Sequence, residues 1–268
     1  MTRTRARSTP GRAPVALIVP GAIAAAFFAV PLLGLLLRTP WSDLIDRLSA
    51  PEISAALRLS LVSSLCAAAL SVVLGLPLAW ILARNQFRGR ALVRALATLP
   101  IVIPPVVGGV ALLLALGRVG LIGRWLESTF GVTLFGSIAA VVIAETFVAM
   151  PFLVLTVESA LRSMDRRYED AASTLGADRW MVFRRITLPA IAPSLGAGAV
   201  LAWARALGEF GATITFAGNV PGRTQTVPLA VYIELQTETE GAIALSLVLV
   251  AVSVLVLLVL RDRYLSTA

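Results

Sequence analysis

The amino-acid sequence predicts an all-α integral membrane protein with six transmembrane helices. Hydrophobic residues make up 58% of the chain and charged residues only 14%, whereas soluble domains have about 45–50% apolar and about 25% charged residues. The mean hydropathy is +0.88. The apolar residues are mostly Leu, Ala and Val, and alternation with a period of two residues is nowhere sustained. The pattern therefore favours helical spans over a transmembrane β-barrel.

Six apolar windows are long enough to cross a bilayer, which takes about 20 residues per helix. They cover residues 15–37, 57–83, 95–117, 137–161, 190–216 and 242–260. The first window is longer than the core of a signal peptide, which has about 7–15 residues, so we expect an uncleaved first span. The third contains Pro104-Pro105 and Gly108-Gly109, which predict an interruption of that helix. Residues 57–260 then form the core of the membrane domain.

The arginines indicate how the chain is oriented in the membrane. Sixteen of the 23 lie on the side of the N-terminus and Arg205 lies within a span; the other six are Arg38, Arg47, Arg58, Arg118, Arg124 and Arg223. Because cytoplasmic loops carry the excess of basic residues, both termini are predicted to be cytoplasmic in a multi-pass protein of the plasma membrane. The inner segments are an arm over residues 1–14, a polar loop over residues 162–189 and a tail over residues 261–268. Because the arginines are spread through short loops, the net charge of +8 does not indicate nucleic-acid binding.

Three absences restrict the chemistry that this chain can perform. It contains no Lys and no His, and Cys66 is its single cysteine. Without Lys it has no ordinary Walker A loop, and without His it has no HExxH zinc site and no Ser-His-Asp triad. Cys66 lies in an apolar run and has no partner for an intrachain disulfide. We therefore expect neither an enzyme nor a metal site.

The polar loop is the only sizeable charged segment on the predicted inner side. Asp165 is placed to cap a short helix, Glu169 and Asp170 favour its first turn, and Gly176 favours its end. A second short helix is expected over residues 178–186, followed by the start of the fifth span at Leu188-Pro189. Residue types alone leave two interpretations: an ordinary connecting loop, or a helix that binds in a groove of another protein.

The spacing within this loop resembles the signature of ABC-importer permeases, which is EAA, three residues, G, nine residues and I-x-L-P. Here the sequence has Asp170-Ala171-Ala172, three residues, Gly176, nine residues and Ile186-Thr187-Leu188-Pro189. Asp170 stands in place of the usual Glu, and Glu169 precedes it. The resemblance implies the type I (MetI-like) permease fold. It also implies that the loop is a coupling helix that enters a cleft of a cytoplasmic ATPase, through Glu169, Asp170, Ala171, Ala172, Gly176, Ile186, Leu188 and Pro189.

Three further strings are similar to molybdate-type oxyanion permeases: LGLPLAWILAR, LPIVIPPVVGGVALLLALG and ARALGEFGATITFAGNVPGRTQTVPLAVY. The resemblance implies a homodimeric permease subunit that translocates molybdate, with an extracytoplasmic oxyanion-binding protein and a separate ATPase subunit as partners. ATP and Mg²⁺ would then bind to the ATPase, and this chain would hold no cofactor. A sulfate, thiosulfate or tungstate permease is the alternative within transport. A stand-alone anion channel or a membrane enzyme is the alternative from another class.

Ionisable and hydroxyl residues inside the predicted spans are candidates for a translocation pathway. Arg205 and Glu209 lie one helical turn apart. They either form a structural ion pair, with each other or with Glu145 or a second subunit, or line the route of the anion. Gly208 and Gly211 permit a break there. The candidate pathway residues are Arg205, Glu209, Thr213, Thr215, Pro104 and Pro105.

Two alternatives stay open from residue types alone. The hydroxyls of Thr213 and Thr215 either face an oxyanion or bond back to their own helix. Arg223, in the expected outer loop at residues 219–226, either meets a docked binding protein or is an ordinary solvated arginine.

Overall fold

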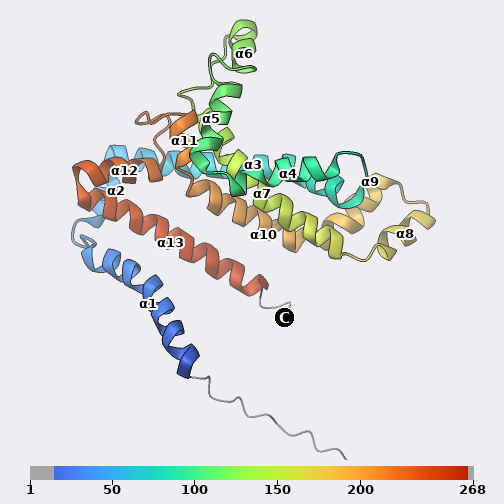
Figure 1. The fold of residues 1–268 in the computed structure, drawn as a ribbon, viewed down its shortest axis with the longest axis horizontal. Helices are drawn as coiled ribbons and strands as arrows, with labels where there is room; N and C mark the ends of the chain where they lie inside the picture. Colours follow the sequence, from blue (N-terminus) through green and yellow to red (C-terminus); the bar gives the residue numbers. More distant parts are fainter. Residues whose placement is uncertain (1–14, 265–268) are drawn as a thin grey trace, which may run out of the picture.

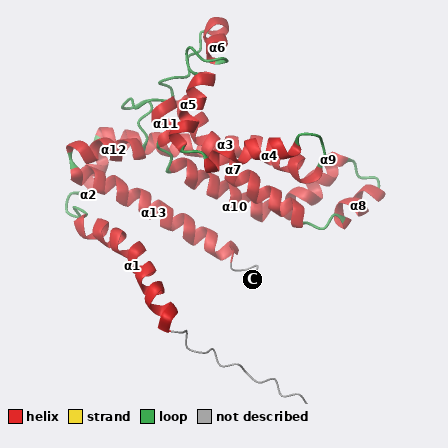
Figure 2. Cartoon of the chain, viewed as in Figure 1, coloured by secondary structure: helices red, strands yellow, loops and turns green. Residues whose placement is uncertain are grey.

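The computed structural model describes residues 15–264, and every regular element within that range is a helix (Figure 2). In chain order the elements are α1 (Val15–Arg38), α2 (Leu44–Ser49), α3 (Pro51–Arg84), α4 (Arg90–Val102), α5 (Pro105–Leu116), α6 (Gly123–Phe130), α7 (Ile138–Ser163), α8 (Arg167–Thr174), α9 (Arg179–Val182), the π-helical turn η1 (Phe183–Thr187), α10 (Leu188–Leu207), α11 (Gly211–Phe216), α12 (Val227–Thr237) and α13 (Thr239–Tyr264). The expected arm over residues 1–14 and the last four residues of the expected tail lie outside this range.

Five of these helical segments are long and apolar enough to cross a membrane: α1, α3, α7, the run from α9 to α10, and α13. The third predicted span is divided between α4 and α5, which end and begin on either side of Ile103 and Pro104. Together these two helices extend about 38 Å at 1.5 Å per residue, whereas neither alone covers the roughly 30 Å hydrocarbon core. The prediction of an all-helical protein with six spans is confirmed, with the third span broken at its proline pair.

The core of the bundle consists of α3, α7 and α10, which pack against one another. Small side chains occupy their contacts, including the fully buried Ala67, Ala79, Ala149 and Ala202. Small residues let helix backbones approach closely, and this close packing replaces the hydrophobic driving force that lipid removes. The core therefore fixes the relative positions of the helices that carry the polar residues.

A buried row of serines ties α3 to its neighbours. Ser60 Oγ accepts from the backbone N–H of Val227 at 2.6 Å, and Ser64 Oγ accepts from Trp203 Nε1 at 3.0 Å. The two bonds join α3 to α12 and α10. Inside a membrane such interhelical hydrogen bonds contribute roughly 0.6–2 kcal/mol each, so α3 is held on several sides.

Helix α1 lies at the edge of the molecule, separated from the central bundle, and among the described helices it packs mainly on α13 (Figure 1). None of its most apolar window is buried within this chain. Apolar side chains such as Phe27, Phe28 and Leu37 are exposed along it. This helix therefore needs a cover of lipid or of another protein chain. On the opposite side of the bundle, α5 turns away from the line of α4 and leads to α6, which projects outward (Figure 1).

Most helix ends differ from the predicted spans by a few residues. The second span is the helix 51–84 rather than 57–83, because Pro51 occupies its first turn, where a proline is tolerated. The third begins at Arg90 rather than at residue 95, and the sixth is the helix 239–264 rather than 242–260. Polar residues at these ends extend the helices beyond their apolar windows, which hydropathy does not detect.

The fifth span is joined to the short helix before it, and α10 begins at Leu188 with Pro189 in its first turn. The sequence predicts a short helix over residues 178–186 that is separate from the fifth span, whereas the helical run is continuous from Arg179 to Leu207. Pro189 has no N–H to donate, and its ring would clash with the carbonyl of Arg185 in an α-helix. The wider π-turn over Phe183–Thr187 accommodates this proline without ending the helix.

Candidate functional site

Helix α8 forms the tip of the polar loop, and local interactions define both of its ends. Asp165 Oδ1 accepts a hydrogen bond from the backbone N–H of Arg167 at 3.0 Å. At the other end Gly176 has φ +86°, and the N–H of Ala177 donates to the carbonyl of Ala172 at 3.0 Å. A left-handed glycine that closes a helix in this way is a common C-terminal cap. The cap makes α8 a short, defined helix that projects from the end of the bundle (Figure 1).

The surface of α8 and α9 exposes large apolar side chains. Leu175 is 89% exposed, and Tyr168 and Trp180 are each 67% exposed. Trp180 stacks on Phe183 with ring centroids 5.6 Å apart. Exposed apolar side chains on a polar segment are typical of a protein contact surface. The predicted contact residues do not include Tyr168 and Leu175. Their presence as large apolar residues among small and charged ones is the feature of the sequence that could have identified them.

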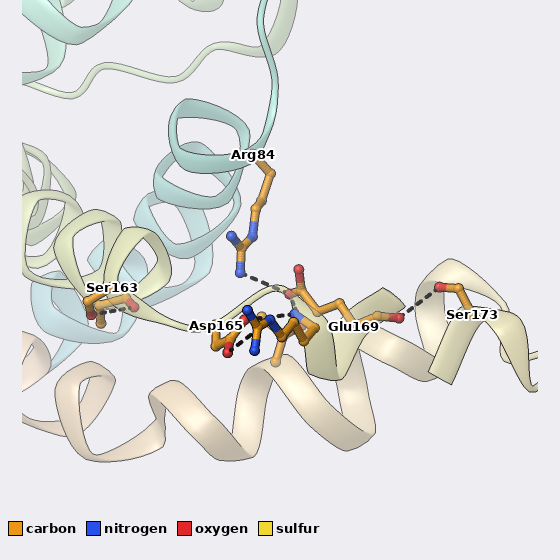
Figure 3. Close-up of polar contacts among 8 residues, drawn as sticks. Arg84, Ser163, Asp165, Glu169 and Ser173 are labelled. Atoms are coloured by element: carbon orange, nitrogen blue, oxygen red, sulfur yellow. Dashed lines mark hydrogen bonds and ion pairs between the residues drawn. The ribbon is translucent and has the colours of Figure 1, made fainter. Parts of the chain in front are cut away.

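The two adjacent carboxylates of α8 have different environments. Glu169 Oε1 accepts from Arg84 Nη2 at 3.1 Å and from Thr187 Oγ1 at 2.7 Å. Figure 3 shows Arg84 reaching down from the end of α3 to Glu169. Asp170 is exposed and makes no side-chain hydrogen bond within the described part of the chain. Glu169 is thus bound inside this chain, while Asp170 is free to meet another molecule.

The remaining predicted loop residues fall into two groups. Ala171, Gly176 and Pro189 are exposed, and Ala172, Ile186 and Leu188 are partly buried. The first group includes Ala171 and Gly176, the two small motif residues that are exposed at the surface of the loop. Of the second group, Ile186 and Leu188 lie where η1 runs into α10, and Ala172 lies within α8. Only part of the motif therefore lies on the surface that another protein can reach.

The predicted pathway residues of the fifth span meet at a break between α10 and α11. Arg205 Nη2 lies 2.8 Å from Glu209 Oε2, and the Glu209 side chain is almost fully buried. Glu209 Oε1 also accepts from the backbone N–H of Ala212 at 2.8 Å, so its carboxylate caps the first turn of α11. Of the alternatives for this pair, the ion pair across one helical turn is the arrangement that the structure shows.

The two broken helices lie against each other, because α5 packs on α11. A Cβ at Gly109 would lie 2.7 Å from Thr215 Cβ and 2.9 Å from Ala212 Cα, and a Cβ at Gly211 would lie 3.0 Å from Pro105 Cβ. Only glycine permits such an approach. The breaks at the proline pair and after Gly208 thus form one region of interrupted backbone, of the kind that transporters place along cavities.

The hydroxyls of the two threonines in α11 behave differently. Thr215 Oγ1 donates to the carbonyl of its own helix at Gly211, at 2.7 Å. Thr213 is fully buried, and its Oγ1 has no hydrogen-bond partner among the described residues. Pro104 is exposed, whereas Pro105 is partly buried beside α11. Thr213 is therefore the hydroxyl of this region that is not already committed to its own backbone.

A second buried carboxylate lies in the same membrane core. Glu145 of α7 is 1% exposed, and its Oε1 accepts from Ser63 Oγ at 2.9 Å. Its other oxygen has no partner among the described residues. Within residues 15–264, Glu145 therefore lacks the counter-ion that Glu209 has in Arg205.

Two grooves that share Gly222 in their linings open beside the loop at residues 219–226. One, of about 610 Å³, is lined by Arg58, Ser54 and Gly222 among others. The other, of about 390 Å³, is lined by Arg223, Ser137 and Gly222. Arg58 and Arg223 are exposed, and within the described range neither has an acidic partner. The grooves therefore present uncompensated positive charge.

The fold is that of ABC-importer permeases. A crystal structure of a bacterial ABC transporter involved in alginate import superimposes with a TM-score of 0.70 at 20% identity, covering 94% of this chain and 95% of that one. The MetNI methionine ABC transporter, in inward-facing conformations, has a TM-score of 0.56 at 22% identity and covers 80% and 95%. At these identities the likeness shows the fold alone.

The chain belongs to the family described as binding-protein-dependent transport system inner membrane component, whose profile matches residues 71–265. It is 47% identical to the molybdenum transport system permease protein ModB of Mycobacterium tuberculosis (strain ATCC 25618 / H37Rv) over 208 residues, which is 78% of each chain. ModB of Escherichia coli (strain K12) is 47% identical over 70% of this chain and 82% of its own. The sulfate transport system permease protein CysT of the same strain is 37% identical over 73% and 70%. The resemblance found in the polar loop is thereby confirmed at the level of the family.

Proposed function

We propose that this chain is the membrane subunit of an ABC importer that carries molybdate, or a similar tetrahedral oxyanion, into the cell. The observation that carries the substrate is the contrast between relatives. Identity to ModB proteins is 46–47%, against 37% to the sulfate permease CysT and 41% to the sulfate permease CysW over a similar share of the chain. Molybdate therefore ranks ahead of sulfate, and tungstate stays an alternative because it closely matches molybdate in size and charge.

Energy for transport comes from a separate ATPase in this proposal. The chain has no Lys among its 268 residues, so it cannot supply the Lys that a Walker A loop places on ATP phosphates. ATP and Mg²⁺ would bind to the partner instead. The exposed surface of α8, with Asp170, Gly176 and Leu175, offers that partner a short helix with small and apolar side chains. Helix-in-groove binding uses such a surface.

The proposed orientation places both termini and α8 in the cytoplasm, following the excess of arginine on that side. The grooves beside Arg58 and Arg223 then open to the outside. Their positive charge suits an acidic surface on a binding protein, or the oxyanion itself as it is released. A structure of the alginate transporter was determined in complex with a periplasmic protein bound to an alginate pentasaccharide, which supports a partner on the outer face.

The working unit in this proposal is a homodimer, with the anion path between two copies. Helix α1 supports this, because its apolar side chains are uncovered and its main packing partner among the described helices is α13. A second copy would cover part of that surface. The region where α5 meets α11 is proposed to border the path. Arg205 attracts the anion there, while Glu209 neutralises most of its charge, so that binding stays weak enough for release.

Uptake into proteoliposomes tests the proposal. The chain is reconstituted with the candidate ATPase, and radiolabelled molybdate is supplied with the loaded binding protein outside. We expect uptake that requires ATP, the ATPase and the binding protein, and that tungstate inhibits more strongly than sulfate. Uptake that persists without the ATPase would indicate a channel. Faster uptake of sulfate than of molybdate, each with its own binding protein, would indicate that sulfate is the substrate.

A further inference from the structure

We propose that Arg84 is a positioning residue for transport: through Glu169 it fixes the exposed helix α8 to the membrane domain. The inference rests on the proposed function in one respect, namely that α8 contacts an ATPase. The positioning itself stands on the contacts of this chain alone. The sequence motif gave no reason to single out Arg84, which lies 85 residues before Glu169.

Helix α8 has little packing of its own to hold it in place. None of its residues is buried, and it packs mainly against α9 and η1. A surface helix of eight residues without a buried face is only marginally stable. Its position must therefore depend on specific polar contacts to the rest of the chain.

The Glu169 carboxylate supplies such contacts to two separate spans. Its Oε1 receives Arg84 Nη2 from the end of α3 at 3.1 Å and Thr187 Oγ1 from η1, at the start of α10, at 2.7 Å. The Arg84 side chain is 8% exposed and that of Glu169 is 18% exposed. Hydrogen bonds to ionised groups are roughly twice as strong as neutral ones. A single oxygen therefore joins α3, α8 and α10 (Figure 3 shows the Arg84 contact).

Arg84 makes displacement of α8 unfavourable. Its Nε is buried and has no partner among the described residues, and Glu169 is its one carboxylate within ion-pair distance in that same range. Displacement of α8 would leave a buried guanidinium without a counter-ion, which is costly. A force on α8 is therefore passed to α3 and α10 together rather than dissipated in a loose loop. Helix α10 ends beside the Arg205–Glu209 pair, so the anchor lies on a direct helical path to the broken region.

The first test uses the purified chain alone in detergent. Hydrogen exchange is measured on the α8 amides in the wild type, Arg84→Gln, Glu169→Gln and Thr187→Val. We expect exchange in α8 to rise about tenfold in the two charge variants, the scale of one lost charged hydrogen bond, with a smaller rise for Thr187→Val. Exchange in the core of α3 and α7 should not change. Asp170→Asn and Arg88→Gln are matched controls, because neither side chain has an intramolecular partner in the described structure. Arg88→Gln should behave as the wild type does, and Asp170→Asn should show only the small rise that follows the loss of one carboxylate from the first turn of α8.

The second test uses the complete transporter, and measures ATP hydrolysed per anion imported. In Arg84→Gln and Glu169→Gln we expect the ATPase to co-purify and hydrolyse ATP, with more ATP used per anion than in the wild type. The charge exchange Arg84→Glu with Glu169→Arg should restore much of the coupling. A role confined to folding would lower the yield of complex without changing this ratio.

Either of two results overturns the inference: α8 exchange in Glu169→Gln equal to that in Asp170→Asn, or wild-type coupling in both single charge variants. If the charge variants fail to assemble with the ATPase, the exchange measurement alone decides. If the wild-type complex imports no anion, the proposed function fails, while the exchange measurement still decides on the anchor.

Discussion

Gly109→Ala tests the contact between the two broken helices, and its cost follows from the coordinates. The added Cβ would lie 2.7 Å from Thr215 Cβ, 2.9 Å from Ala212 Cα and 2.9 Å from the Ala212 carbonyl oxygen. Carbon atoms in contact prefer about 3.5–4.0 Å, so α5 and α11 must separate by about 1 Å. Two of the three contacts are backbone atoms, which cannot move away by a rotamer change.

Overpacking of this kind costs about 1–3 kcal/mol. Alanine is intrinsically favoured over glycine in a helix by about 0.5–1 kcal/mol, which offsets part of the loss. We therefore expect a net destabilisation of about 1–2 kcal/mol, and a Tm that falls by a few degrees for a chain of this size. If the region borders the anion path, as proposed, uptake should fall as well.

The assay is thermal unfolding of the purified protein in detergent, with Gly34→Ala as the matched control. Gly34 lies inside α1, where a Cβ would have no atom within 4 Å, so this variant should be neutral or slightly stabilising. The reasoning would be refuted if Gly109→Ala raised Tm as much as Gly34→Ala did. That result would mean that α5 and α11 are not in close contact.

Three further predictions concern other parts of the molecule. Gly176→Arg should insert normally but lose ATP-driven uptake, because its side chain blocks the contact surface of α8. Gly89→Arg, also at a left-handed glycine with open space, should keep uptake. Co-purification with the ATPase and uptake are measured for both variants, and equal uptake in the two would refute the contact. Glu209→Gln should lower the free energy of unfolding by about 1–3 kcal/mol, and with it Tm, because it removes the buried ion pair. Glu145→Gln should not lower Tm, because that carboxylate has no cationic partner in the described structure. Equal Tm shifts in the two variants would contradict this. Arg223→Glu should weaken stimulation of ATP hydrolysis by the binding protein, most at low salt, and stimulation that is unchanged at low salt would exclude a role for that charge.

The polar loop shows where prediction from sequence succeeded and where it stopped. Spacing and residue type predicted a short helix that ends at Gly176, and the structure has that helix with its left-handed glycine cap. They did not distinguish the two adjacent carboxylates. Neighbouring residues on a helix point in different directions, and only the positions of Arg84 and Thr187 determine that Glu169 faces inward and Asp170 outward. The roles of these residues in transport stay predictions.

The sequence by itself determined that the chain is an all-helical membrane protein, that its third span is interrupted, and which family it resembles. Composition, hydropathy and proline positions are local properties, so they can be read along the chain. Only the tertiary structure decided that helix α9 continues through a π-turn into α10, that Gly109 and Ala212 bring the two breaks together, and that Arg84 holds α8. The last two features depend on contacts between residues that are far apart in the sequence, and packing between helices, rather than local preference, selects them.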